Sequence, residues 1–221
     1  MTGRVTTARA LGEPRDIQFN QEKIVFAIAL AMFAGFSVLL HGFLTAGNII
    51  SLVQNVSILG VLGIGMAVTI IGRGIDLSMV SNMAISVAWV LYLGNKGVPL
   101  PEALLCGLAF SLAIGVVNGV LIAYVEIPAI FATLAMGTAI YGFGHSVLVN
   151  SDVIFMPTAA SWFKAIGGGA VLGVPSPVAW LLIFALAAFL FLRFTRPGRF
   201  IYAMGDNPLS ARVSGVPTRP M

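Results

Sequence analysis

The chain has 221 residues, of which 58% are apolar and only 9% are charged, and its formal net charge is +4 at pH 7. Because soluble domains carry about 25% charged residues, this composition excludes a soluble globular protein, and the high apolar content excludes a disordered chain. A single cysteine, Cys106, and glycines without a triplet period exclude disulfide-rich and collagen-like proteins. The class that remains is the integral membrane protein.

Six apolar segments follow one another along the chain, and each approaches the length of about 20 residues that a helix needs to cross a bilayer. The sequence therefore predicts an all-α fold, a polytopic membrane helix bundle of about six transmembrane helices. The polar tails are residues 1–23 and 195–221, and the mixed stretch 151–176 leaves open a short re-entrant or interfacial helix over 158–166. The predicted spans within the membrane domain 24–194 are 24–44, 49–71, 75–94, 102–125, 128–150 and 177–194.

The basic residues predict the orientation of the bundle. Six spans put both ends of the chain on one side, and the basic residues of the two tails, together with Arg73, far outnumber Lys96 and Lys164 on the other side. Since cytoplasmic loops carry the excess of lysine and arginine, we expect both termini in the cytoplasm. The positive charge therefore lies at membrane borders, and no nucleic-acid partner is expected.

Polar residues recur inside the second, third and fourth spans. Ser78, Asn82 and Ser86 are one helical turn apart and therefore share one face. Asn55 and Asn118 are further polar residues in the neighbouring spans. Polar groups in hydrocarbon need partners, so this face points either at another helix or at a polar path through the bundle. The residues leave both interpretations open.

The second and third spans are joined by Gly72-Arg-Gly-Ile-Asp-Leu-Ser78, which is too short for a conventional loop. Glycine permits a sharp turn there. Asp76 is predicted to be the N-cap of the third helix, with its carboxylate accepting from Ser78 or Met79 N–H. Contact with a transported solute is the alternative role for Asp76, because discontinuous helices form transport sites elsewhere.

A stripe of small residues marks the fourth span at every fourth position. Such a stripe lets another helix approach closely, and Gly115 and Gly119 complete a GxxxG match. Packing within the bundle and a seam between two chains are both compatible with it. The stripe comprises Ala103, Gly107, Ser111, Gly115, Gly119 and Ala123.

Motifs of catalysis are missing from the sequence. There is no P-loop, no HExxH and no GxSxG, and His41 and His145 have no second ligand at metal-binding spacing. The sequence therefore predicts no catalytic residue, no metal site and no cofactor in this chain.

Three stretches resemble a known family. They are Gly63-Ile-Gly-Met-Ala-Val-Thr-Ile-Ile-Gly72 leading into Gly74-Ile-Asp-Leu-Ser78, then Ile127-Pro-Ala-Ile-Phe-Ala-Thr-Leu-Ala-Met136, and Thr195-Arg-Pro-Gly-Arg-Phe-Ile-Tyr-Ala-Met-Gly-Asp-Asn207 followed by Ala211-Arg-Val-Ser-Gly215. In this order and spacing, over residues 24–216, the chain resembles the permease subunit of monosaccharide ABC importers of the ribose/xylose/arabinose type.

The resemblance implies a transporter of several subunits, whose permease lies in the bacterial cytoplasmic (inner) membrane. Two permease subunits form a homo- or heterodimer, a cytoplasmic ABC ATPase binds the ATP, and an extracytoplasmic sugar-binding protein docks on the outer face. The missing P-loop agrees with a motor on a separate chain. The candidates for the translocation path are Asn55, Asp76, Ser78, Asn82, Ser86 and Asn118, and those for ATPase coupling are Arg196, Gly198, Arg199, Gly205, Asn207, Arg212 and Gly215.

The chain also departs from the family pattern. Arg73 stands where the family usually has Ser or Gly, and Met79-Val-Ser81 replaces the usual Val-Gly-Ser, so the sugar is left open. Family members continue into further membrane helices beyond the segment that ends at Gly215, which leads us to expect a truncated permease. The alternative function is a non-transporting membrane scaffold or an inactive permease fragment.

Overall fold

The structure is a computed structural model, and it describes residues 21–151, 153–157, 161–171 and 173–217. It divides into two units, Met1–Ile49 and Ile50–Met221. Most of the predicted tail 1–23 lies outside the described residues.

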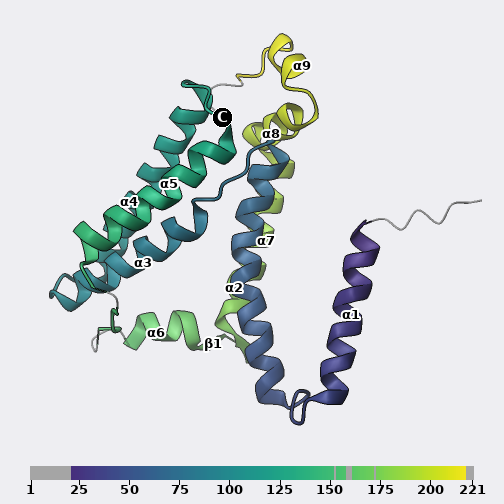
Figure 1. Cartoon of the computed structure of the whole chain (residues 1–221), viewed down its shortest axis with the longest axis vertical. Coiled ribbons are helices and arrows are strands. Elements are labelled where there is room, and N and C mark those ends of the chain that lie inside the picture. The colour runs from purple at the N-terminus through teal and green to yellow at the C-terminus, as the bar shows by residue number, and fades with distance from the viewer. Residues whose placement is uncertain (1–20, 152, 158–160, 172, 218–221) are drawn as a thin grey trace, which may run out of the picture. The chain divides into compact units, whose positions relative to one another are not determined.

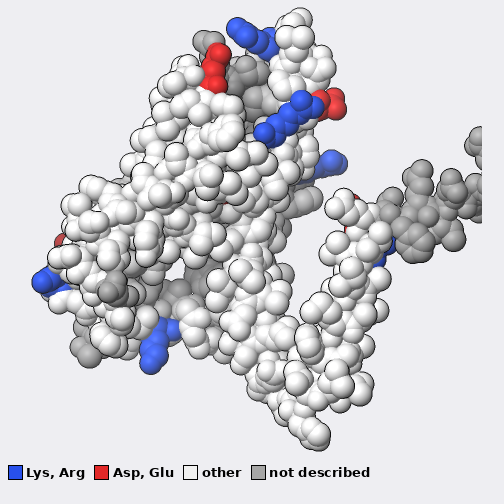
Figure 2. Space-filling model, in the orientation of Figure 1, with Lys and Arg blue, Asp and Glu red and all other residues white. Residues whose placement is uncertain are grey.

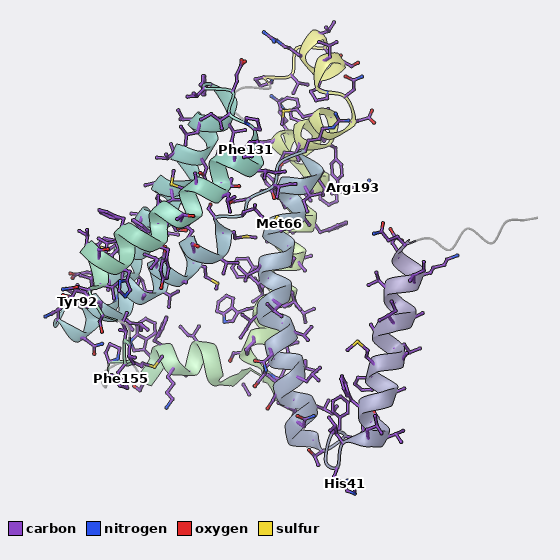
Figure 3. The ribbon with its side chains drawn as sticks, viewed as in Figure 1. His41, Met66, Tyr92, Phe131, Phe155 and Arg193 are labelled. Carbon is purple, nitrogen blue, oxygen red and sulfur yellow. The ribbon has the colours of Figure 1, made fainter. Side chains whose placement is uncertain are left out.

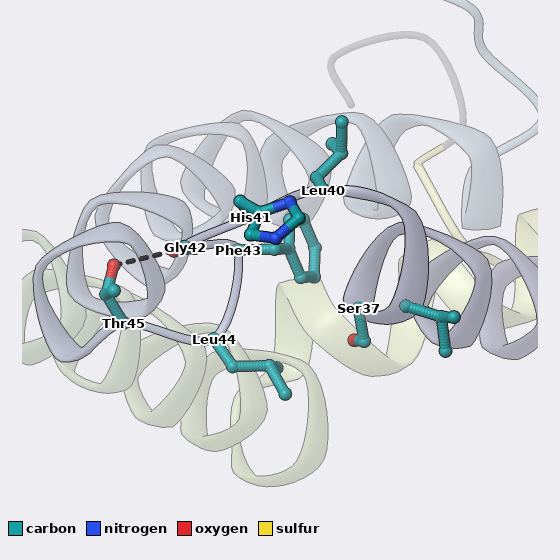
Figure 4. Close-up of a pocket in the computed structure, with 8 residues that line it drawn as sticks. Ser37, Leu40, His41, Gly42, Phe43, Leu44 and Thr45 are labelled. Carbon is teal, nitrogen blue, oxygen red and sulfur yellow. Dashed lines mark hydrogen bonds between the residues drawn. The ribbon is translucent and has the colours of Figure 1, made fainter.

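The first unit contains helix α1 (Gln21–Leu39), a tight turn, and the start of α2 (Ala46–Ile71). The predicted first span reached residue 44, but the helix ends at Leu39 because the chain turns at Gly42, whose φ of +82° is readily adopted only by glycine. Phe43 packs back against Phe33, with ring centroids 5.4 Å apart. The turn surrounds a cavity of about 360 Å³, and Thr45 donates to the Gly42 carbonyl (Figure 4).

The second unit holds the remainder of α2 and all the other described elements (Figure 1). They are α3 (Met79–Asn95), α4 (Leu100–Ala123), α5 (Ala129–Phe143), the π-helical turn η1 (Gly144–Val149), α6 (Ser161–Gly168), the strands β1 (Ala170–Val171) and β2 (Val174–Pro175), α7 (Ser176–Phe194), α8 (Arg196–Asp206) and α9 (Pro208–Val213).

The predicted all-α, polytopic helical bundle is confirmed. Among the described residues, five helical stretches are long and apolar enough to cross a membrane: α1, α2, α4, α5 together with η1, and α7. The predicted third span is the exception, because α3 begins only at Met79 and has 17 residues. At 1.5 Å per residue it is about 25 Å long, somewhat less than the hydrocarbon core of about 30 Å.

Helix α3 packs against α4 and against α5 with η1, and α4 and α5 also contact each other. Glycines make this packing close: a Cβ at Gly107 on α4 would overlap Val90, and one at Gly144 would overlap Ile85. Val90 and Ile85 are accordingly buried. Since no water drives helices together in hydrocarbon, such close backbone contact is what holds a membrane bundle together.

Helix α7 lies beside α2, where a Cβ at Gly60 would stand 2.8 Å from Leu181. At its end, the chain turns sharply into α8, and Thr195 caps the new helix by accepting from Gly198 N–H at 3.1 Å. Sequence reasoning expected only a polar tail here, whereas residues 196–206 and 208–213 are helical.

The mixed stretch before α7 contains the short helix α6 and an antiparallel strand pair, in which Ala170 faces Pro175. The helix expected over 158–166 is observed over 161–168, and residues 158–160 lie outside the described part. Trp180 of α7 donates to the Ile166 carbonyl at 3.2 Å and so ties α6 to the start of α7. On the visible face of this unit, charged side chains gather at the two ends of the helices and the middle is uncharged (Figure 2).

Candidate functional site

The segment 72–78 between α2 and α3 is not helical, and it forms the centre of the candidate site. Helix α2 ends in a turn in which Arg73 has φ +64° and Gly74 N–H donates to the Thr69 carbonyl at 2.8 Å. A left-handed residue is a common way to end a helix, although arginine adopts it at a cost that glycine does not pay. Residues 74–76 have no regular secondary structure, and residues 77 and 78 form a turn that leads into α3.

A buried hydrogen-bond network fixes the far end of this segment to α4. One carboxylate oxygen of Asp76 accepts from Ser78 N–H at 2.8 Å and from the Ser78 hydroxyl at 2.6 Å. The Ser78 hydroxyl accepts in turn from the Asn118 amide at 2.8 Å. Ser78 and Asn118 are 1% and 5% exposed, so α4 holds the start of α3 through polar contacts inside an apolar bundle.

The predicted N-cap role of Asp76 is wrong by two residues, because Ser78 occupies the N-cap position of α3. The carboxylate does accept from Ser78 N–H, as expected. It acts one step earlier, by closing a turn that leads into the helix.

Helix α5 also holds the same segment. Leu77 N–H donates to the hydroxyl of Thr133 at 3.1 Å, and this hydroxyl lies within hydrogen-bond distance of the carbonyls of Ile75 and Ala129. One turn further along α5, a Cβ at Gly137 would stand 3.3 Å from Ser78 Cα. Sequence reasoning missed Thr133, although it lies within one of the family-like stretches.

Asn82 and Ser86 continue the polar face of α3 beyond Ser78 and line a groove of about 360 Å³. Asn82 donates to the Ser111 carbonyl of α4, and the Ser86 hydroxyl donates to Asn82, both at 3.3 Å. The rest of the lining is largely apolar and includes Met83 and Phe163. Of the path candidates, Asn55 belongs neither to this groove nor to the Ser78 network, and it is exposed on α2.

The segment 72–78 is also tied to helix α8. The Arg73 guanidinium donates to the carbonyl oxygens of Gly205 and Asp206, at 2.8 and 2.9 Å. These carbonyls end α8, where a cation is favoured by the helix dipole. A Cβ at Gly205 would overlap the Ile71 carbonyl, so only glycine allows α8 to lie this close to the end of α2.

Residues 48–221 match the family described as branched-chain amino acid transport system / permease component. The chain belongs to this permease family. The relatives it matches are transport subunits and not enzymes, and with its apolar helices this chain is a multi-pass protein of the inner membrane. No solved structure matches the chain.

Three curated permeases illustrate the similarity. The chain is 34% identical over 200 residues to the ribose import permease protein RbsC of Escherichia coli, an alignment that covers 89% of this chain and 61% of the relative. It is 34% identical over 173 residues to the galactofuranose transporter permease protein YtfT of the same species, with 78% and 50% covered. It is 33% identical over 216 residues to the L-arabinose ABC transporter permease protein AraH of Azospirillum brasilense, with 96% and 61% covered.

The small-residue stripe on α4 divides into two parts. Gly107 meets Val90 and the Ser86 carbonyl of α3, whereas Gly115 and Gly119 have open space around them. The reason is geometric: steps of four residues advance about 40° beyond a full turn, so the stripe winds away from α3. The face toward α3 continues instead through Asn118.

The ATPase-coupling candidates also fall into two groups. Gly198 and Gly205 pack against backbone, of α7 and α2 respectively, and Asn207 caps α9 by accepting from Leu209 and Ser210 N–H. Gly215 has φ +83° just beyond α9. The remaining candidates are exposed arginines: Arg196, Arg199 and Arg212. Arg73, which bonds to the end of α8, was not among the coupling candidates. The signal that could have identified it is that arginine stands where the family usually has Ser or Gly.

Proposed function

We propose that the chain forms part of the membrane-spanning permease of an ABC importer that moves a monosaccharide or a related small polar solute. The observation that carries this proposal is the similarity, over 89% of the chain, to a ribose import permease, with galactofuranose and L-arabinose permeases at similar identity. The chain spans about 61% of the length of the ribose and arabinose relatives. ATP is bound and hydrolysed by a separate ATPase subunit.

We assign the translocation path to the groove beside Asn82 and Ser86. Its walls are apolar, while an amide and a hydroxyl offer donors and acceptors of the kind that sugar hydroxyls require. Asp76, Ser78 and Asn118 bond to one another, and their proposed role is to fix the start of α3 at one end of that groove. Asn55 is retained as a path candidate on α2.

The proposed orientation puts α8 and α9 in the cytoplasm. At that end of the second unit lie Arg73, Arg193, Arg196, Arg199 and Arg212, whereas Lys96 and Lys164 belong to the other end, a bias typical of the cytoplasmic side. The ATPase would dock on α9, and the sugar-binding protein on the side of α6.

The coupling route follows from the Arg73 contacts. A movement of α8 caused by the ATPase reaches the segment 72–78 through the two hydrogen bonds of Arg73 and the close packing of Gly205. The other end of that segment is the Ser78 network, where α3 begins. Seven residues thus connect the proposed ATPase surface to the proposed path.

The experiment is uptake of labelled pentoses and hexoses by cells that express the chain with its ATPase and binding-protein partners. We expect the double variant Asn82→Ala/Ser86→Ala to lose at least about tenfold in uptake. The matched control is Thr138→Ala, which removes an exposed hydroxyl of α5 that lies outside the groove. Unchanged uptake in the double variant, at equal amounts of membrane-inserted protein, contradicts the assignment of the path.

The second candidate function is a non-transporting scaffold, favoured by the open space at Gly115 and Gly119. In the importer, this face would pack against the second permease subunit. The variant Gly115→Leu/Gly119→Leu separates the two functions: an importer loses dimerisation and uptake together, whereas a scaffold loses assembly while uptake is unaffected.

A further inference from the structure

A cavity of about 390 Å³ lies at the junction of α7 and α8, within the range of about 300–1,000 Å³ that small-molecule sites span. It is lined by Phe189, Leu192, Arg193, Arg199 and Tyr202. The cavity exists because Thr195 ends α7 and caps α8, and because Gly198 is buried against the backbone of Phe191 and Leu192. Helix α8 therefore begins directly against the end of α7, a helix that is long and apolar enough to cross a membrane.

Two cationic side chains face this cavity. Arg193 comes from the last turn of α7 (Figure 3) and Arg199 from the first turns of α8. Within residues 21–151, 153–157, 161–171 and 173–217, neither guanidinium has a hydrogen bond or an ion pair. With the hydroxyl of Tyr202 they supply a set of donors suited to a phosphate group, since guanidinium binds phosphate in a bidentate manner.

An apolar stripe on α7 leads up to the cavity. Leu182, Leu186 and Phe189 are 63%, 58% and 57% exposed, and with Arg193 they follow the spacing of one helix face. From Leu182 to Arg193 the stripe is about 16 Å long, close to half of the hydrocarbon core of about 30 Å. The stripe therefore has the length of one leaflet, and the cationic cavity lies at the end of the stripe where α7 meets α8.

We propose that this cavity binds the headgroup phosphate of an anionic phospholipid, whose acyl chain lies along Leu182, Leu186 and Phe189. The two arginines match the charge of the headgroup, and the stripe matches the length of the chain. A soluble protein docked on the same arginines would leave the stripe uncovered, which is why the geometry favours a lipid over the ATPase as the occupant. Clusters of basic residues at the cytoplasmic end of a membrane helix attract such headgroups.

The test is native mass spectrometry of the purified full chain in detergent, titrated with phosphatidylglycerol or with phosphatidylethanolamine. We expect one phosphatidylglycerol to be retained per chain, and the variant Arg193→Gln/Arg199→Gln to weaken its binding at least about tenfold. The control Arg196→Gln/Arg212→Gln removes the same charge from exposed arginines that do not line the cavity, and we expect its affinity to stay within about twofold. The single variants Arg193→Gln and Arg199→Gln serve if the double variant does not fold, and each should weaken binding about threefold.

Four results would overturn the proposal. The first is equal retention of the two lipids, and the second is an equal loss of affinity in the control variant, which would indicate diffuse surface charge. Displacement of phosphatidylglycerol by millimolar inorganic phosphate would indicate a site for free anions. If the variant Arg193→Gln/Arg199→Gln bound the lipid as the wild type does but no longer co-purified with the ATPase, the two arginines would be assigned to protein docking. None of these measurements depends on transport, so their outcome is separate from that of the proposed function.

Discussion

Single side chains of α4 and α5 hold the end of the segment 72–78 that leads into α3, through hydrogen bonds that are buried or partly buried from water. Thr133 is 1% exposed and serves the backbone of this segment from α5. Asn118 donates to Ser78, while its own carbonyl oxygen has no partner among the residues that the structure describes. A buried acceptor of this kind costs free energy.

Replacement of Thr133 by valine keeps the shape of the side chain and removes its hydroxyl. Leu77 N–H then loses its acceptor, and we expect the chain to be destabilised by about 1 kcal/mol, the usual size of an interhelical hydrogen bond in a membrane protein. Thermal unfolding in detergent measures the change. Thr138→Val is the control, because that hydroxyl bonds only within its own helix; equal destabilisation of the two variants would contradict the role of Thr133.

At the scale of elements, the helix pair α3–α4 depends on backbone contact at Gly107. We expect Gly107→Leu to lower the free energy of unfolding by about 1–3 kcal/mol or more, the cost of overpacking, because its side chain would overlap Val90 and the Ser86 carbonyl. Gly115→Leu has open space around it and should leave the melting temperature of the isolated chain unchanged. Equal melting temperatures of the two variants would show that the contact face of α4 has been assigned wrongly.

The C-terminal end of helix α8 depends on hydrogen bonds from Arg73. We expect Arg73→Gln to speed hydrogen exchange at the C-terminal amides of α8 about tenfold or more, because two charge-assisted hydrogen bonds to Gly205 and Asp206 are lost. Arg196→Gln is the control, since this exposed arginine starts the same helix and is not bonded to the segment 72–78. Exchange that is the same in wild type and in Arg73→Gln would exclude a mechanical link at this position.

The sequence predicts these elements to different degrees. Apolar runs locate the membrane helices because length and hydropathy suffice to identify them, and α7 begins one residue from its predicted position. The start of α3 is placed wrongly, since the apolar residues Ile75 and Leu77 do not reveal that the helix begins only at Met79. The contacts of Arg73 with Gly205 and Asp206 join residues more than 130 positions apart, and no local pattern can predict such a pair.

At the scale of the whole molecule, the residues 50–217 that are described have two ends of different character. One end carries α8, α9 and most of the arginines, and the other carries α6 with the two lysines. We expect a cysteine at position 212 to react with a membrane-impermeant maleimide only after the cytoplasmic face is opened, and a cysteine at position 96 to react in intact cells. Cys106→Ser provides the cysteine-free background, and the reverse labelling pattern would invert the proposed orientation.

The central claim is that this chain provides the membrane path of an ATP-driven sugar importer. The most direct measurement is accumulation of labelled ribose, L-arabinose and galactose in cells that express the ATPase and binding-protein partners, with and without this chain. The account predicts energy-dependent accumulation of at least one sugar that is lost without the chain and restored by its expression. Accumulation that is identical with and without the chain, for every sugar and with both partners present, would contradict it.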